Sequence, residues 1–229
     1  MVNIKKKRGS APRKRKSKGA GKLSHVIFGA LVALGLLWII TSVFKTKKPD
    51  VGPYEVGVEV AIANYGTEIK RLSKKYDLSP DYLMALIMLE CSGRRDVPPR
   101  FEKGIYKKLQ EVQSGKRTLE GISKGEIGDA SDEALRNLAS SWGPFQLMGY
   151  KCLHLGIQIK DLRGENSLEH GVEWINRTYG DYIRKGRYED AFHIHNTGHP
   201  VSKPGKYNTY DKNYVPNGIR YMEHFHNKM

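Results

Sequence analysis

Apolar residues recur at helical spacing along much of the chain beyond residue 57. In the first such stretch the apolar positions are separated by alternating steps of four and three residues: Val58, Ile62, Tyr65, Ile69, Leu72 and Tyr76. This spacing puts them on one face of a helix, so residues 58–76 are predicted to form an amphipathic helix with one buried stripe.

The next predicted helix, from Asp81 to about Cys91, lacks a polar face in its middle. Its stretch 85–89 (ALIML) is apolar on every side, which is typical of a helix at the centre of a core. Ser79 and Pro80 are expected to be the N-cap and the first-turn proline. Gly93 is expected to end the helix.

Further helices are predicted near residues 105–112, after Asn166, over 188–195 and from Tyr214 onward. Asn166 and Glu169 predict a capping box at the second of these. The apolar faces expected to turn inward are Leu168, Val172, Ile175 and Tyr179, and then Val215, Ile219, Met222 and Phe225. Residues 93–133 and 199–213 are predicted to be rich in loops. We find no persuasive strand alternation and no internal repeat, so the fold class is expected to be mainly α.

A different pattern precedes these helices. From Val26 to Phe44 the chain has 19 consecutive uncharged residues, VIFGALVALGLLWIITSVF, and about 20 are needed to cross the hydrocarbon core of a bilayer. A removable signal peptide has a shorter apolar stretch of roughly 7–15 residues and a cleavage site of small residues, and no such site precedes the lysines at 45, 47 and 48. Residues 25–44 are therefore predicted to be a single transmembrane helix.

The distribution of charge orients this predicted anchor. The chain of 229 residues has 39 Lys and Arg against 24 Asp and Glu, a formal charge of +15, and ten of the basic residues lie in 1–24 without an acidic one. By the positive-inside rule this tail stays in the cytoplasm, and residues 45–229 lie outside. The expected organisation is a basic tail (1–24), the membrane helix (25–44), a linker (45–57) and one domain (58–229).

The basic tail has other interpretations. Its cations could bind anionic lipid or nucleic acid electrostatically. It has no aromatic residues between the cations and no sequence-reading motif, so no specific nucleic-acid partner is expected. The favoured interpretation is an orientation signal.

Glu90 is the main candidate for chemistry in the predicted outer domain. It lies at the end of the apolar central helix, where it could simply emerge at the surface. Because the preceding turns are core, we expect it instead at the floor of a cleft. Apolar neighbours and the C-terminal end of a helix dipole both favour the protonated carboxyl, which is the form that a general acid requires.

A second cluster spans residues 140–150, SSWGPFQLMGY. Gln146 lies between glycines and large apolar groups, and its amide could offer both a donor and an acceptor to a sugar. An equal alternative is a structural turn in which this amide bonds to the backbone. Trp142, with Tyr207, Tyr210 and Tyr214, could stack on sugar faces or only hold the loops.

The histidines and cysteines allow further alternatives. His193, His195 and His199 suggest a zinc site, but residues two apart on a helix face different directions, and no metal or other cofactor is expected. Cys91 and Cys152 could form one disulfide or remain two buried thiols. Tyr214 precedes Pro216 at the start of a predicted helix, and its hydroxyl could point into a cleft or its ring could only pack in the core.

Taken in order, four strings resemble the lysozyme-like superfamily, especially lytic transglycosylases of the soluble-transglycosylase type. They are Glu90-Cys91-Ser92-Gly93, residues 142–148 (WGPFQLM), residues 195–198 (HNTG) and residues 213–216 (NYVP). Residues 99–102 (PRFE) and 139–149 (ASSWGPFQLMG) also resemble the N-acetylmuramidase domains of phage endolysins. Two departures from the family pattern are Cys91, where Ser is usual, and His195, where Tyr is common.

The resemblance implies a lysozyme-like domain that cleaves the β-1,4 bond between N-acetylmuramic acid and N-acetylglucosamine in peptidoglycan. Glu90 would act as acid and then as base, giving a 1,6-anhydro product. The implied contacts with the sugar are Ser92, Trp142, Gln146, Asn196 and Tyr214. A hydrolysing muramidase needs a second carboxylate, for which Glu102 and Asp96 are the nearest candidates, although Glu102 could form a loop salt bridge instead.

Two other functions stay open. One is a non-catalytic lysozyme-like module that binds the wall or belongs to an envelope-spanning assembly. The other is a zinc peptidase or amidase built on the histidines. The expected partners are peptidoglycan glycan strands and, through the N-terminal helix, a membrane.

Overall fold

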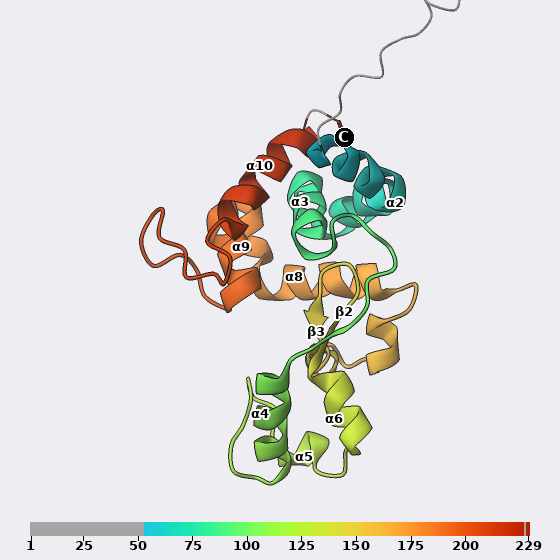
Figure 1. The fold of residues 1–229 in the computed structure, drawn as a ribbon, viewed down its shortest axis with the longest axis vertical. Coiled ribbons are helices and arrows are strands. Elements are labelled where there is room, and N and C mark those ends of the chain that lie inside the picture. The colour runs from blue at the N-terminus through green and yellow to red at the C-terminus, as the bar shows by residue number, and fades with distance from the viewer. Residues whose placement is uncertain (1–52, 227) are drawn as a thin grey trace, which may run out of the picture. The chain divides into compact units, whose positions relative to one another are not determined.

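The computed structural model describes residues 53–226 and 228–229 (Figure 1). The basic tail, the predicted membrane helix and most of the predicted linker lie outside these residues. None of the described helices is both long and apolar enough to cross a membrane.

The described elements are helices with three short strands between them. In chain order they are α2 (Pro53–Tyr76), α3 (Pro80–Cys91), β1 (Arg100–Phe101), α4 (Lys103–Gln113), α5 (Lys124–Ile127), α6 (Asp132–Leu138), β2 (Ser140–Trp142), β3 (Leu147–Met148), α7 (Lys151–Leu155), the 3-10 helix η1 (Ile159–Leu162), α8 (Ser167–Arg184), α9 (Tyr188–Thr197) and α10 (Tyr214–His226). The domain is mainly α, as its sequence predicts.

Helix α3 is the centre of the first of two hydrophobic clusters. Every side chain from Tyr82 to Met88 is buried, and α3 packs between α2 and α10 (Figure 1). The Ser79 hydroxyl accepts a hydrogen bond from the Tyr82 backbone N–H, which confirms the predicted N-cap. The helix ends at Cys91 because Ser92 already adopts the left-handed conformation, with φ of 54°, one residue before the expected Gly93.

The helices around α3 bury the faces that their periodicity predicts. Helix α2 begins at Pro53, five residues before the start of the apolar pattern at Val58, so its first turn lies in the segment predicted to be a linker. The buried members of the predicted stripes are Val58, Tyr65, Ile69, Leu72, Leu168, Val172, Ile175, Tyr179, Val215 and Phe225. Ile62, Tyr76, Ile219 and Met222 are partly buried against the same cluster.

A second hydrophobic cluster is built from α4 to α7, the strands and η1. Its buried residues include Leu109, Val112, Leu135, Leu147 and Leu155. Helix α4 confirms the helix predicted near residues 105–112. In Figure 1 α4, α5 and α6 lie together at the end of the domain away from α3.

The described residues contain three short strands that the sequence pattern did not predict. Strands β1, β2 and β3 form an antiparallel sheet in that order, with Phe101 opposite Ser140 and Ser141 opposite Met148. Each strand has only two or three residues, so the alternation of apolar and polar positions that identifies a strand cannot develop.

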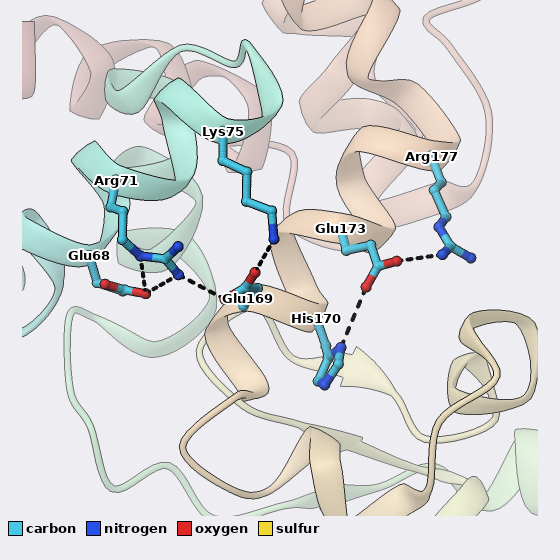
Figure 2. Close-up of polar contacts among 7 residues, drawn as sticks. All are labelled: Glu68, Arg71, Lys75, Glu169, His170, Glu173 and Arg177. Carbon is cyan, nitrogen blue, oxygen red and sulfur yellow. Dashed lines mark hydrogen bonds and ion pairs between the residues drawn. The ribbon is translucent and has the colours of Figure 1, made fainter.

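The predicted capping box at α8 is also wrong. Asn166 is the N-cap residue, but its side chain makes no capping hydrogen bond. Figure 2 shows the Glu169 carboxylate between two cations of α2 instead: Arg71 Nη2 is 2.7 Å from Oε2, and Lys75 Nζ is 2.5 Å from Oε1. The Glu169 carboxylate therefore binds Arg71 and Lys75, which are distant in sequence, and not the backbone at the start of α8.

Both cysteines are free thiols and both are buried. Cys91 belongs to the first cluster and Cys152 to the second. Burial raises the pKa of each thiol to about 11, so both are protonated and unreactive near neutral pH.

Candidate functional site

A cleft of about 770 Å³ is lined by residues from both clusters. From the first cluster's side it is lined by Tyr179 and by the end of α9, residues 194–199. The other lining residues are Gln146, Leu147 and Met148 of the sheet region, then Ile105, Glu120, Tyr150, Lys151, His154, Trp174 and Thr178. Glu90 and Tyr214 are not among the lining residues.

Glu90 lies in the last turn of α3, where the apolar central helix ends. The Glu90 side chain is only 16 % exposed to solvent. The hydroxyl of Tyr214 donates a hydrogen bond to Glu90 Oε1, and Nε2 of His195 lies 3.6 Å from the same oxygen. Since His195 also lines the cleft, it connects the carboxyl to that space.

Tyr214 is the first residue of α10, and the contact between α10 and α3 brings its hydroxyl to Glu90. Its side chain is buried. Burial, and after it the negative charge of Glu90, hold the pKa of Tyr214 well above the usual value. The phenol therefore stays protonated and acts as a donor to the carboxylate.

His195 is held by two further polar neighbours. Its Nδ1 lies 2.6 Å from the Tyr179 hydroxyl, and its Nε2 lies 3.1 Å from the Phe145 carbonyl oxygen. Burial lowers the pKa of His195 below its usual value and outweighs the opposing effect of the Glu90 charge. The imidazole is therefore neutral near pH 7.

Gln146 occupies the turn between β2 and β3, in a left-handed conformation with φ of 47°. Its Oε1 accepts a hydrogen bond of 2.8 Å from the Ser141 hydroxyl, and its Nε2 donates one of 3.1 Å to the Gly143 carbonyl. The Gln146 amide thus bonds to the backbone of its own turn, as the structural alternative predicts. Gln146 also lines the cleft, and an amide of this kind has further donor and acceptor capacity.

The other residues predicted to contact the sugar lie in different surroundings. Asn196 is exposed and lines the cleft. Ser92 is exposed at the end of α3. Trp142 donates its indole N–H to the Asn137 carbonyl at 2.9 Å, with the Arg163 guanidinium 4.9 Å from its ring centroid, and it does not line the cleft.

The carboxylates proposed as a second acidic group are placed on the surface. Glu102 pairs with Arg100 at 2.8 Å, as the salt-bridge alternative anticipates, and Asp96 is exposed. Neither lines the cleft.

Glu120, a carboxylate that was not predicted from the sequence, does line the cleft. Tyr150 donates a hydrogen bond of 2.7 Å to its Oε1, and Lys151 pairs with its Oε2. Burial raises the pKa of Glu120, but the hydrogen bonds from Lys151 and Tyr150 outweigh this and lower it. Glu120 lies in a loop without periodic apolar residues, so its sequence shows only a charged residue followed by Gly121 and does not indicate a functional site.

The histidines do not form a chelating set. Between residues 53 and 229, setting aside residue 227, no group of three His, Cys, Asp or Glu side chains is arranged to hold a metal ion. His193 is buried and engaged with the loop after α9: its Nδ1 lies 2.6 Å from the His199 carbonyl oxygen, and its Nε2 accepts the Asn208 backbone N–H at 3.1 Å.

The chain resembles a solved structure in fold. No protein-family model matches the chain, and no curated protein matches it. Among solved structures, the chain is similar to the crystal structure of the Burkholderia AP3 phage endolysin, with 16% sequence identity and a TM-score of 0.48, over 71% of this chain and 70% of that one.

Proposed function

We propose that this protein is a peptidoglycan-cleaving glycosidase of the lytic transglycosylase kind, with Glu90 as its acid and base. The observation that carries the proposal is the setting of Glu90. A carboxyl withdrawn from water ends an apolar helix, receives a hydrogen bond from Tyr214 and contacts His195, which lines a cleft. A glutamate that only covers the surface would be solvent-exposed and would not require these contacts with Tyr214 and His195.

In the proposed reaction, protonated Glu90 gives its proton to the glycosidic oxygen as the bond from the muramoyl C1 to the O4 of N-acetylglucosamine breaks. The muramoyl 6-hydroxyl then bonds to C1 and passes its proton to the Glu90 carboxylate, which restores the acid. The product carries a 1,6-anhydro ring, and no water is consumed. Gln146 and Asn196 line the cleft and are proposed to contact the sugar.

The positions of the other carboxylates support the mechanism that uses one. Hydrolysis by a muramidase uses a second carboxylate to activate water or to act as nucleophile. Glu102 is engaged with Arg100 away from the cleft lining. A hydrolytic muramidase is the second candidate, favoured by the place of Glu120 in the cleft, although that carboxylate is held by Lys151 and Tyr150.

The location of the domain is part of the proposal. We propose that residues 25–44 cross a membrane once, with the basic tail in the cytoplasm and the described domain outside. The charge distribution in the sequence supports this orientation. An enzyme that cuts an extracytoplasmic polymer must face it, and attachment to the membrane would suit an envelope-spanning assembly.

The test is digestion of purified peptidoglycan by the full-length protein, with the released fragments identified by mass spectrometry. Glu90→Gln keeps the shape of the side chain and removes its acid, so it is expected to abolish release. Glu133→Gln, at an exposed position of α6, is the matched control and is expected to release fragments as the wild type does.

The products separate the candidate mechanisms. Fragments with 1,6-anhydro ends support the transglycosylase, whereas reducing ends, together with loss of activity in Glu120→Gln or Glu102→Gln, support the muramidase. Release that persists in Glu90→Gln but stops with a chelator supports a metallopeptidase or amidase. Binding without release by any variant supports the non-catalytic module and contradicts the proposed function.

A further inference from the structure

The contacts of His195 determine which of its ring nitrogens carries the proton. The Phe145 carbonyl oxygen can only accept a hydrogen bond, so Nε2 of His195, 3.1 Å away, must be the donor. In a neutral imidazole, Nδ1 is then unprotonated and can only accept a hydrogen bond. The Tyr179 hydroxyl, 2.6 Å away, must therefore donate to it. The two contacts together permit one neutral tautomer.

The same ring nitrogen also lies near the Glu90 side chain. Nε2 lies 3.6 Å from Glu90 Oε1, the oxygen that also receives the Tyr214 hydroxyl. One donor from α10 thus bonds to this carboxyl oxygen, and a second donor group, from α9, lies near it. Glu90 Oε2 has no hydrogen-bond or ion-pair partner in the part of the chain that the structure describes.

We propose that His195 is a positioning residue that, as the neutral Nε2–H tautomer, holds Glu90 Oε1 together with Tyr214 and leaves Oε2 as the oxygen that exchanges the proton with the sugar. This inference rests on the proposed function of Glu90. It gives a role to the histidine at the position where the resembling family commonly has a tyrosine.

The arrangement fits both protonation states of Glu90 in the catalytic cycle. While Glu90 is protonated, the His195 Nε2–H remains with the Phe145 carbonyl. When Glu90 has given up its proton, a small rotation brings Nε2–H closer to Oε1, and a hydrogen bond to an ionised acceptor is roughly twice as strong as a neutral one. The donor thus stabilises the carboxylate at the stage at which it must act as a base.

The surroundings keep the histidine in this role. The ionisable groups near it are Glu90 of α3, Tyr179 of α8 and Lys151 of α7, and Lys151 is itself paired with Glu120. Tyr179 is buried, and burial holds its pKa well above the usual value, with a further contribution from nearby Tyr82. Tyr179 therefore keeps the hydrogen that it donates to Nδ1.

The Phe145 carbonyl is held in place as well. The Phe145 ring is fully buried in the first cluster, and the backbone of Gly171 in α8 approaches it so closely that a Cβ at that position would be 2.4 Å from Cδ2. A clamped ring fixes the adjacent carbonyl, and with it the direction of the His195 ring.

Two substitutions of His195 separate its donor from its bulk. In His195→Gln the side-chain amide can place an N–H near the Nε2 position without titrating, whereas His195→Phe keeps a ring and has no donor. With soluble glycan fragments, His195→Phe is expected to lower kcat by roughly 10- to 100-fold with little change in KM, and His195→Gln to stay within about tenfold of wild type. Thermal unfolding of both variants shows whether each is folded.

NMR of the full-length protein labelled with ¹⁵N-histidine identifies the tautomer directly, and this measurement does not depend on enzymatic activity. The resonances that disappear in His195→Gln belong to His195. They are expected to show a protonated Nε2 and an unprotonated Nδ1 at pH 7. In Tyr179→Phe, which removes the donor to Nδ1, the other tautomer is expected to become populated.

The outcomes distinguish this inference from the proposed function. If Glu90→Gln is inactive but His195→Phe, folded, matches His195→Gln in kcat, the positioning role is overturned while the proposed function stands. A cationic His195, or one protonated at Nδ1, at pH 7 overturns it as well. Activity that survives in Glu90→Gln overturns both, because Glu90 then has no proton to exchange.

Discussion

The hydroxyl of Tyr214 donates a hydrogen bond to the carboxyl of Glu90, although 124 residues separate them in the chain. The contact depends on the packing of α10 against α3. It gives the carboxyl a fixed donor, and it brings residues 213–216 next to Glu90.

Removing this donor is expected to impair catalysis more than folding. Tyr214→Phe keeps the buried ring and leaves Glu90 Oε1 without its main donor. A hydrogen bond to a charged group contributes about 1.5–3 kcal/mol, so kcat is expected to fall roughly 10- to 100-fold. Peptidoglycan digestion assays measure it, and Tyr210→Phe, at a fully exposed tyrosine, is the control that should have wild-type activity. Equal rates for both variants would contradict a role for the Tyr214 hydroxyl.

The pH dependence of stability reports on His195. Burial lowers the pKa of this imidazole in the folded state, while in the unfolded chain it titrates near about 6.5. As the pH falls, the unfolded state binds the proton first. The stability associated with neutral His195 is therefore complete above about pH 6.5 and is lost as the pH falls from there towards the lower folded-state pKa.

His195→Gln has no such titration. The difference in unfolding free energy between wild type and His195→Gln, measured by urea denaturation at a series of pH values, should change below about pH 6.5 with a slope of at most about 1.4 kcal/mol per pH unit. The wild type is expected to lose stability relative to the variant as the pH falls. A difference that is constant between pH 7 and pH 4.5 would mean that His195 is not buried as a neutral group.

The turn between β2 and β3 is expected to tolerate glycine at residue 146 better than alanine. Both substitutions lose the hydrogen bonds to Ser141 and Gly143, at a cost of about 1 kcal/mol each. Only glycine relieves the left-handed φ of 47°, which costs a residue with a Cβ about 1–2 kcal/mol. Urea unfolding of Gln146→Gly and Gln146→Ala should place the glycine variant higher in stability, and the reverse order would argue against a left-handed Gln146.

Close approach of the backbone at Gly171 predicts a loss of stability in Gly171→Ala. The added Cβ would be 2.4 Å from Phe145 Cδ2, so the ring must shift, and overpacking of this kind costs about 1–3 kcal/mol. Gly104 of α4 is the matched control, because nothing lies within 4 Å of a Cβ there. Gly104→Ala should be neutral or slightly stabilising in the same thermal-unfolding measurement. A Gly171→Ala protein as stable as Gly104→Ala would show that Phe145 is not clamped.

Local sequence pattern predicted the six longer helices of the described residues, and with them the position of Glu90 at the end of the apolar α3, but not the short helices α5, α6 and α7. Periodicity of apolar residues and the signals at Ser79 and Pro80 act over a few residues, so local pattern was sufficient for the longer helices. The local pattern at Glu169 predicted a capping box, and this prediction is wrong because two cations of α2 bind the Glu169 carboxylate. Local pattern also missed strands too short to show alternation.

The side chains around the Glu90 carboxyl are set by the packing of helices that are distant in sequence. Tyr214 and His195 reach Oε1 from α10 and α9, and Gln146 bonds within its own turn while it lines the cleft. The tertiary structure also placed Glu120, and not Glu102, in that cleft. These relationships depend on how helices distant in sequence pack around α3, and no spacing along the chain encodes a distance between atoms of separate helices.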